Sequence, residues 1–195
     1  MVTQEKTLAD AFYETLKDVF YAEKQSVKAL KRSAKAAKSP KLKDAFETHG
    51  EESSHQVERL TEVFEIIGKP ARAKTCEAMQ GLTSEMEEDL EEFGATEAAD
   101  AVLIGCAQAI EHYEIARYGV LKAWARRLGL SEVETLLGET LQEEKRADQL
   151  LSQIADQADA DDTKRASRDD VKSPAKVPSR SKSAPDSASR DTTRA

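Results

Sequence analysis

Several acidic side chains and one histidine occupy positions where the helical pattern of this chain requires apolar residues. Over residues 8–30, apolar residues recur every three or four positions, but Glu23 interrupts the row. A second row, over residues 133–155, is interrupted in the same way by Glu144. The acids and the histidine on or beside such rows are Glu23, His49, Glu52, Glu111, Glu114, Glu144 and Asp148. These residues are the candidate ligands of a metal site.

This combination of side chains favours a metal site over an ordinary core. An isolated buried carboxylate costs several kcal/mol or takes up a proton, whereas several together are tolerable when they share cations. Carboxylates with an imidazole suit iron or manganese better than zinc, which favours sites rich in cysteine and histidine. We therefore expect two iron or manganese ions per chain, bridged by carboxylates. The alternative is that these acids form interhelical salt bridges, for example with Arg117 and Arg146.

The histidine ligand can be chosen by projecting its helix down the axis. Glu52 and His55 have the Glu-x-x-His spacing of di-iron proteins. At about 100° per residue, however, His49 falls on the apolar side of the helix, whereas His55 points roughly 130° away from it. We therefore prefer His49 with Glu52 and keep His55 as the alternative. His112, next to Glu111, points away from the acidic pair and is expected to cap, pack or face solvent.

The apolar periodicity predicts an all-α protein with four long helices and one shorter helix, over about residues 4–37, 40–67, 75–92, 97–128 and 131–155. The helix starts are indicated by Ser39 with Pro40 and by Thr96, and the stops by Gly68 and Gly129. Short connections make two antiparallel hairpins, joined by a connection of about 27 residues that contains the shorter helix. A four-helix bundle with one long crossover is the ferritin-like arrangement.

The register of the two hairpins gives a separate check on the ligand set. Glu23 and Glu52 lie about 15 residues to either side of the first turn, and Glu114 and Glu144 about 15 to either side of the second. At 1.5 Å per residue, each pair stands roughly 22 Å from its own turn. If the crossover places the two turns at opposite ends, both pairs meet near the middle of the bundle.

Composition argues against several other classes of protein. No window approaches 18 consecutive apolar residues, and the first residues lack the apolar stretch of a secretion signal. Two cysteines, Cys76 and Cys106, are too few for a disulfide framework and favour a reducing cytoplasm. The net charge of −8 argues against nucleic-acid binding by the folded part. Without a glycine-rich phosphate loop or a Ser/His/Asp triad, no catalytic residue is assigned.

The character of the chain changes near residue 156. Residues 156–195 contain no Leu, Ile, Phe, Tyr or Trp, so they cannot bury enough apolar surface to offset their chain entropy. We therefore expect a folded domain over residues 1–157 and a disordered tail over residues 158–195, rich in Ser, Asp, Lys, Arg and Pro. Residues 163–195 carry a net positive charge. The tail is expected to act as a solvating segment, with weak contact to DNA or another polyanion as the alternative.

Five sequence blocks stand in order along about residues 5–157. They are Glu23 in Tyr-Ala-Glu-Lys-Gln, His49 with Glu52 before Val57–Leu60, Cys76–Met79 with Gly81–Leu82, Ala107–Ala116 with Tyr118–Gly119, and Glu143–Glu144 with Ala147–Asp148. Together they resemble the YciE/YciF family, a bacterial group of ferritin-like stress proteins. The resemblance implies a rubrerythrin-like bundle, a homodimer and a dinuclear metal site. It implies a link to stress response more than a defined reaction.

One departure from the general di-iron pattern concerns the last helix. Many ferritin-like proteins have Glu-x-x-His there, whereas Glu144 is followed three residues later by Ala147. The second histidine is therefore missing, and Asp148 or water could fill its position.

These observations favour a cytoplasmic dinuclear iron protein, or one with manganese, that handles iron or peroxide under stress. If the centre turns over, it is a di-iron oxidase or peroxidase with an unknown electron donor. The alternative is a non-catalytic helical scaffold whose basic tail binds DNA or another polyanion. Storage of iron in a cage is a third hypothesis, although no sequence feature specifies such a shell.

Overall fold

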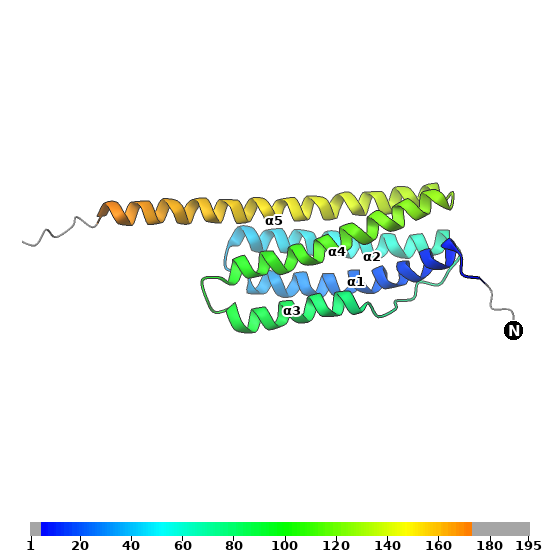
Figure 1. Cartoon of the computed structure of the whole chain (residues 1–195), viewed down its shortest axis with the longest axis horizontal. Helices are drawn as coiled ribbons and strands as arrows, with labels where there is room; N and C mark the ends of the chain where they lie inside the picture. Colours follow the sequence, from blue (N-terminus) through cyan, green and yellow to red (C-terminus); the bar gives the residue numbers. More distant parts are fainter. Residues whose placement is uncertain (1–4, 173–195) are drawn as a thin grey trace, which may run out of the picture. The chain divides into compact units, whose positions relative to one another are not determined.

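The computed structural model describes residues 5–172, with side chains described for residues 5–158, and within these residues all regular structure is helical (Figure 1). The five helices are α1 (Leu8–Ala36), α2 (Pro40–Ile66), α3 (Glu77–Phe93), α4 (Ala99–Arg127) and α5 (Ser131–Lys172). Their order and type confirm the sequence prediction of four long helices and a shorter one. The chain divides into two units, residues 1–159 and 160–195, and the candidate ligands all belong to the first.

The turn between α1 and α2 is held by a residue from a distant part of the chain. Pro40 begins α2 behind Ser39, as predicted, but the side chain of Ser39 makes no capping hydrogen bond. Instead, the carboxylate of Asp100 in α4 accepts hydrogen bonds from the backbone N–H groups of Lys38 and Ser39, at 2.7 and 2.8 Å. This contact ties the first turn of α4 to the α1–α2 turn.

The ends of the helices follow the sequence signals with one exception. Gly68 and Gly129 adopt left-handed φ angles of 64° and 74° just after α2 and α4, as expected of glycine stops. The expectation that Thr96 caps α4 is wrong, because the N-cap residue is Ala98. The Thr96 hydroxyl accepts a hydrogen bond from the N–H of Ala98 and so organises the turn that precedes the helix.

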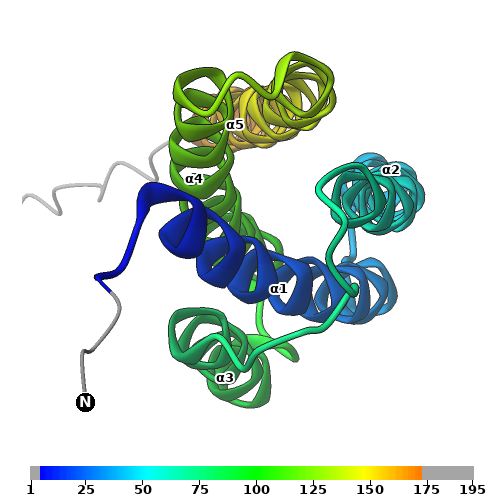
Figure 2. The same cartoon turned by 90° about the vertical axis from the view of Figure 1, so that its right-hand side faces the viewer.

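Within the first unit, α1 lies among three other helices. It contacts α2, α3 and α4, and Figure 2 shows it between them. The α1–α2 turn and the α4–α5 turn lie at opposite ends of the helices, because the connection through α3 carries the chain back along their length (Figure 1). This is the arrangement that the register argument required.

The four long helices share two apolar clusters with a polar layer between them. One cluster contains Phe12, Leu16, Val19, Phe20, Leu60, Val63, Phe64, Tyr118, Leu121, Ala125, Val133, Leu137 and Leu141. The other contains Leu30, Ala34, Leu42, Phe46, Leu103, Ile104, Ala107, Leu151 and Ile154. On every long helix, the buried acid or histidine falls between the residues of these two clusters. The helices thus bury a polar layer midway along an otherwise apolar core.

A third cluster packs α3 against α1 and α4 and is rich in sulfur. Its buried members are Ala22, Ala29, Cys76, Met79, Met86 and Ile110. The Cys76 thiol lies 2.8 Å from the hydroxyl of Tyr113. Both cysteines are free, and no disulfide contributes to this packing among the described residues.

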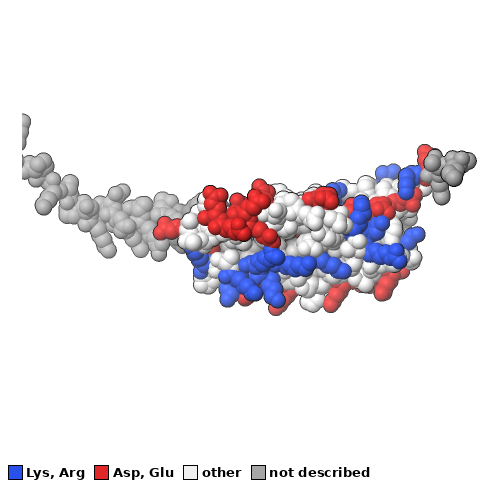
Figure 3. Space-filling view, turned by 90° about the horizontal axis from the view of Figure 1, so that it is seen from below, with Lys and Arg blue, Asp and Glu red and all other residues white. Residues whose placement is uncertain are grey.

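Charges of both signs gather on the face formed by α3 and α1. Figure 3 shows an acidic patch beside a band of basic side chains. The exposed acids of α3 include Glu85, Glu88 and Glu91. Arg32 of α1 forms an ion pair with Glu87 of α3. Opposite charges therefore help to hold α3 against α1.

Helix α5 extends further than its apolar row. It continues to Lys172, whereas the row ends at Ala155 and the tail was expected to begin at residue 158. No glycine or proline occurs between residues 139 and 172, so nothing in that stretch breaks a helix. Residues 173–195, which make up most of the positively charged segment 163–195, lie outside the described residues. None of the described helices combines the length and apolar character needed to cross a membrane.

Candidate metal centre

The polar layer consists of four glutamates and one histidine, supplied by all four long helices. Glu23 comes from α1, His49 from α2, Glu111 and Glu114 from α4, and Glu144 from α5. Each of these side chains is between 0% and 6% exposed. The sequence prediction that His49 rather than His55 faces the core is confirmed, since His55 is exposed.

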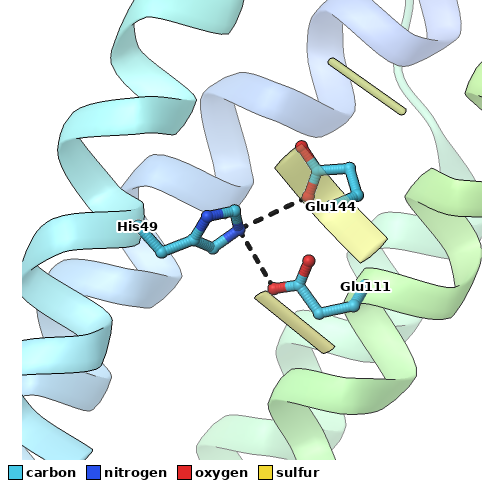
Figure 4. A group of neighbouring side chains, drawn as sticks. All are labelled: His49, Glu111 and Glu144. Atoms are coloured by element: carbon cyan, nitrogen blue, oxygen red, sulfur yellow. Dashed lines mark ion pairs between the residues drawn. The ribbon is translucent and has the colours of Figure 1, made fainter. Parts of the chain in front are cut away.

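His49 stands between two carboxylates from other helices. Its Nε2 lies 3.2 Å from Oε1 of Glu111 and 3.4 Å from Oε2 of Glu144 (Figure 4). One potential ligand atom from each of the three residues lies within 4.8 Å of the others. On the opposite edge of the ring, Nδ1 lies 3.2 Å from Oε2 of Glu52. The imidazole is therefore oriented by Glu52 and directs its other nitrogen into the layer.

Glu23 and Glu114 complete the layer and are held by hydroxyl groups. The hydroxyl of Tyr118 donates a hydrogen bond of 2.6 Å to Oε1 of Glu23. The hydroxyl of Ser26 donates a longer one, 3.4 Å, to Oε2 of Glu114. Each of these two carboxylates thus has one oxygen held by a hydrogen bond and one oxygen without a hydrogen-bond partner.

Many polar atoms of this layer have no hydrogen-bond partner. They are Oε2 of Glu23, Oε2 of Glu111, Oε1 of Glu114, both carboxylate oxygens of Glu144, and Nε2 of His49. Although Nε2 of His49 is close to two carboxylates, neither is placed for a directed hydrogen bond. Buried polar groups in native proteins are almost always satisfied, so a cluster of unsatisfied acceptors requires an explanation.

Salt bridges do not provide that explanation. Among residues 5–158, no Lys or Arg lies within ion-pair distance of the five buried residues. Arg117, an expected partner, instead lies over the ring of Tyr113, 5.1 Å from its centroid. Arg146 is exposed at the surface of α5. The alternative that these two arginines neutralise the acids is therefore wrong.

Burial and mutual repulsion favour protonation of the metal-free layer. Burial, followed by the charge of Glu144, holds the pKa of Glu23 well above its usual range. Burial, then the charge of Glu23, has the same effect on the pKa of Glu114. Burial raises the pKa of Glu111 to about 8, even though His49 opposes the rise. Burial lowers the pKa of His49, but the nearby glutamates outweigh it, and the net pKa lies well above the usual value.

The donor set fits a pair of divalent cations. Four ionised glutamates carry four negative charges, which two divalent ions neutralise while His49 remains a neutral imidazole. Carboxylate oxygens with one imidazole nitrogen are ligands that iron and manganese accept. Six of the nine unsatisfied buried side-chain atoms among the described residues belong to these five residues, and each of the six can donate an electron pair to a metal.

Two of the predicted ligands occupy other positions. The Glu52 side chain is 41% exposed, at the edge of the layer, where it contacts His49. Asp148 is not brought into the layer. Its carboxylate accepts a hydrogen bond of 3.0 Å from Gln108 and lies 3.2 Å from Nε2 of His112. Asp148 follows Glu144 by four residues, but its carboxylate extends toward α4 side chains near the surface.

Sequence reasoning missed a polar network between α2 and α5. Arg59 donates two hydrogen bonds to the carboxylate of Glu143, at 2.7 and 3.0 Å, and one of 2.7 Å to the hydroxyl of Thr140. Gln56 donates another to Glu143, at 3.1 Å. Since Glu143 precedes Glu144, this network fixes the rotation of α5 about its axis and hence the direction of Glu144. The available sequence signal was Gln56, a polar residue on the apolar side of its helix.

Comparisons with known proteins show the family of the chain. Residues 7–164 match the family described as "Domain of unknown function (DUF892)". The chain is 44% identical over 152 residues to Protein YciF of Escherichia coli K12, covering 77% of this chain and 91% of YciF.

Solved structures of related proteins have the same fold. The crystal structure of the E. coli stress protein YciF superposes with a TM-score of 0.74 at 42% identity, covering 77% of this chain and 96% of that one. The structure of YcfI from Rhodopseudomonas palustris also has a TM-score of 0.74, at 38% identity, covering 78% and 97% of the two chains. A protein of Xanthomonas campestris shares the fold at 22% identity, with a TM-score of 0.64 and 83% and 99% coverage. The chain therefore belongs to the DUF892 family, the family of the stress protein YciF.

Proposed function

We propose that this protein is a ferritin-like four-helix bundle that binds two iron or manganese ions and handles peroxide or iron in the bacterial stress response. The observation that carries the proposal is the buried layer of four glutamates and a histidine with unsatisfied ligand atoms. The resemblance to YciF, which is described as a stress protein, supports the connection to stress.

In this proposal, the five buried residues hold the metals. Glu23, Glu111, Glu114 and Glu144 supply carboxylate oxygens, and His49 supplies Nε2. A bound pair of redox metals supplies two electrons to a small oxidant such as a peroxide. The chain's own contribution is to bind and orient, with Tyr118 fixing Glu23 and Glu52 fixing the imidazole. The two apolar clusters exclude bulk water from both sides of the layer.

Metal stoichiometry tests the proposal directly. The full chain, produced with iron and manganese supplied, is expected to contain about two metal ions per chain. Glu144→Gln keeps the shape of the side chain but removes its charge, and is expected to reduce the metal content strongly. Glu132→Gln, at an exposed position of the same helix, is the matched control and should leave it unchanged. Protein that takes up no iron on anaerobic addition of Fe(II) would refute the proposal.

A homodimer in the bacterial cytoplasm is part of the same proposal, on the strength of the family resemblance. Sedimentation velocity of the full chain distinguishes a dimer from both a monomer and a ferritin-type cage. A cage would replace peroxide chemistry with storage as the proposed role.

A further inference from the structure

A cavity of about 310 Å³ leads from the surface to the polar layer. It lies between α2 and α5, and His49, Glu52 and Glu111 are among the residues that line it. Exposed residues such as Thr48 and Leu150 also line it, so it is open to solvent. The cavity is therefore a route by which a molecule from solution can reach the buried ligands.

The cavity is larger than hydrogen peroxide needs. A water molecule occupies about 30 Å³ in the liquid, and hydrogen peroxide has only one more heavy atom. Pockets for organic ligands begin at about 300 Å³, close to the volume found here. The size of the cavity thus favours an organic molecule over dioxygen or hydrogen peroxide alone.

The two ends of the cavity differ in chemistry. At the inner end stand the imidazole of His49 and the carboxylate of Glu111. Most of the remaining wall is hydrocarbon, from Leu30, Phe46, Leu151 and the 39% exposed Leu150. Three exposed charged residues, Lys41, Asp44 and Arg146, also line the cavity. A ligand matched to this surface has one polar end, placed at the metal centre, and an apolar body.

Ala147, three residues after Glu144, is a small residue in the wall of the cavity. It lines the cavity and occupies the position at which many ferritin-like proteins carry the histidine of Glu-x-x-His. A methyl group there leaves space that an imidazole would fill. The side of the centre that lacks this ligand therefore faces the cavity, as in catalytic metal sites that keep one coordination position open.

We propose that this cavity is the substrate pocket of the centre and that it takes organic hydroperoxides with an apolar body. The inference rests on the proposed function. Reduction of ROOH to ROH and water breaks the O–O bond and consumes two electrons and two protons. Two reduced ions held by the buried glutamates and His49 would supply one electron each, and the protons would come from solvent through the open cavity. The apolar body lies against Phe46 and Leu151.

The test separates binding from turnover by using the product alcohol of cumene hydroperoxide. Cumyl alcohol cannot be reduced, so its affinity for the full chain can be measured by calorimetry and by NMR shifts, before and after metal loading. Ala147→Trp is expected to weaken binding at least about tenfold by filling the cavity. Thr48→Phe, at an exposed lining position, provides a second variant should the first fold poorly. Ala123→Trp, on the exposed side of α4, is the matched control and should stay within about twofold of the parent.

Two results would overturn the inference. One is the absence of saturable binding by the parent chain, and the other is an equal affinity in the cavity variants and the control. In metal-loaded protein, Ala147→Trp should also raise the KM for cumene hydroperoxide by a larger factor than the KM for hydrogen peroxide, which needs less space. A chain that binds two metals but no alcohol refutes this inference alone, whereas a chain that binds no metal refutes the proposed function.

Discussion

Metal loading should expel about four protons per chain at pH 7, two for each divalent ion. Burial raises the pKa of Glu111 to about 8 and holds the pKa values of Glu23 and Glu114 well above their usual range. The pKa of His49 is also raised well above its usual value. A buried metal-free layer that stays electrically neutral holds four protons, shared among its four carboxyl groups and the imidazole. Two divalent ions restore neutrality only when all four carboxylates are ionised and the imidazole has lost its proton.

Calorimetry in buffers of different ionisation enthalpy measures this proton release. The metal-free full chain is titrated anaerobically with Fe(II) or Mn(II), and the slope of heat against buffer enthalpy gives the number of protons. With two protons per ion, the apparent affinity near pH 7 rises about a hundredfold per pH unit. Glu132→Gln, at an exposed site, should release the same number of protons as the parent. Fewer than about one proton per ion would refute the reasoning, because it would mean that the glutamates are ionised and hydrated before metal arrives.

Three further predictions concern single groups. The pKa of Glu111 is about 8 in the folded chain and that of His49 is also raised, so the folded metal-free chain binds more protons than the unfolded chain. Its free energy of unfolding should therefore fall as the pH rises from about 5 to about 8, by up to about 1.4 kcal/mol per pH unit for each group. Urea unfolding measures this, and a flat profile would contradict it. Tyr118→Phe removes the hydrogen bond that fixes Glu23, so it should weaken metal binding about tenfold, as measured by competition with a chelator. The circular dichroism spectrum should stay unchanged. An unchanged metal affinity would show that Glu23 needs no orientation. Burial raises the pKa of the Cys106 thiol to about 12, so iodoacetamide at pH 8 should modify it about a thousandfold more slowly than an ordinary thiol, as mass spectrometry of the labelled peptides can check; labelling at the ordinary rate would refute the raised pKa.

Helix positions and the direction of His49 could be predicted because they depend on local periodicity alone. Apolar residues at steps of three and four locate a helix and its buried side, whatever lies opposite. That projection correctly predicted that His49 faces inward and His55 outward, although the Glu-x-x-His spacing had suggested His55 as the ligand. The register of the turns added the level of each acid along the helices, since the rise per residue is constant.

Features set by partners on other helices could not be predicted in this way. Asp148 shares a side of α5 with Glu144, yet Gln108 and His112 of α4 provide it with nearer partners. Thr96 has the residue type of an N-cap, but the chain makes another turn before α4 begins. The cavity is lined by residues from four helices, Ala147 among them, so its shape depends on how those helices pack and not on local periodicity.

The five buried residues come from four different helices, and this affects how long the chain stays folded. With metals bound, segments far apart in the sequence are joined at one point, and none of the four helices can leave without losing a ligand. In a chain that held the proposed metals, unfolding would require their departure, so the rate of metal release would limit the rate of unfolding. Such a chain would resist heat and proteolysis while it stayed loaded, and a chelator would shorten its lifetime. In a cell under stress, loss of metal would thus also mark the protein for degradation.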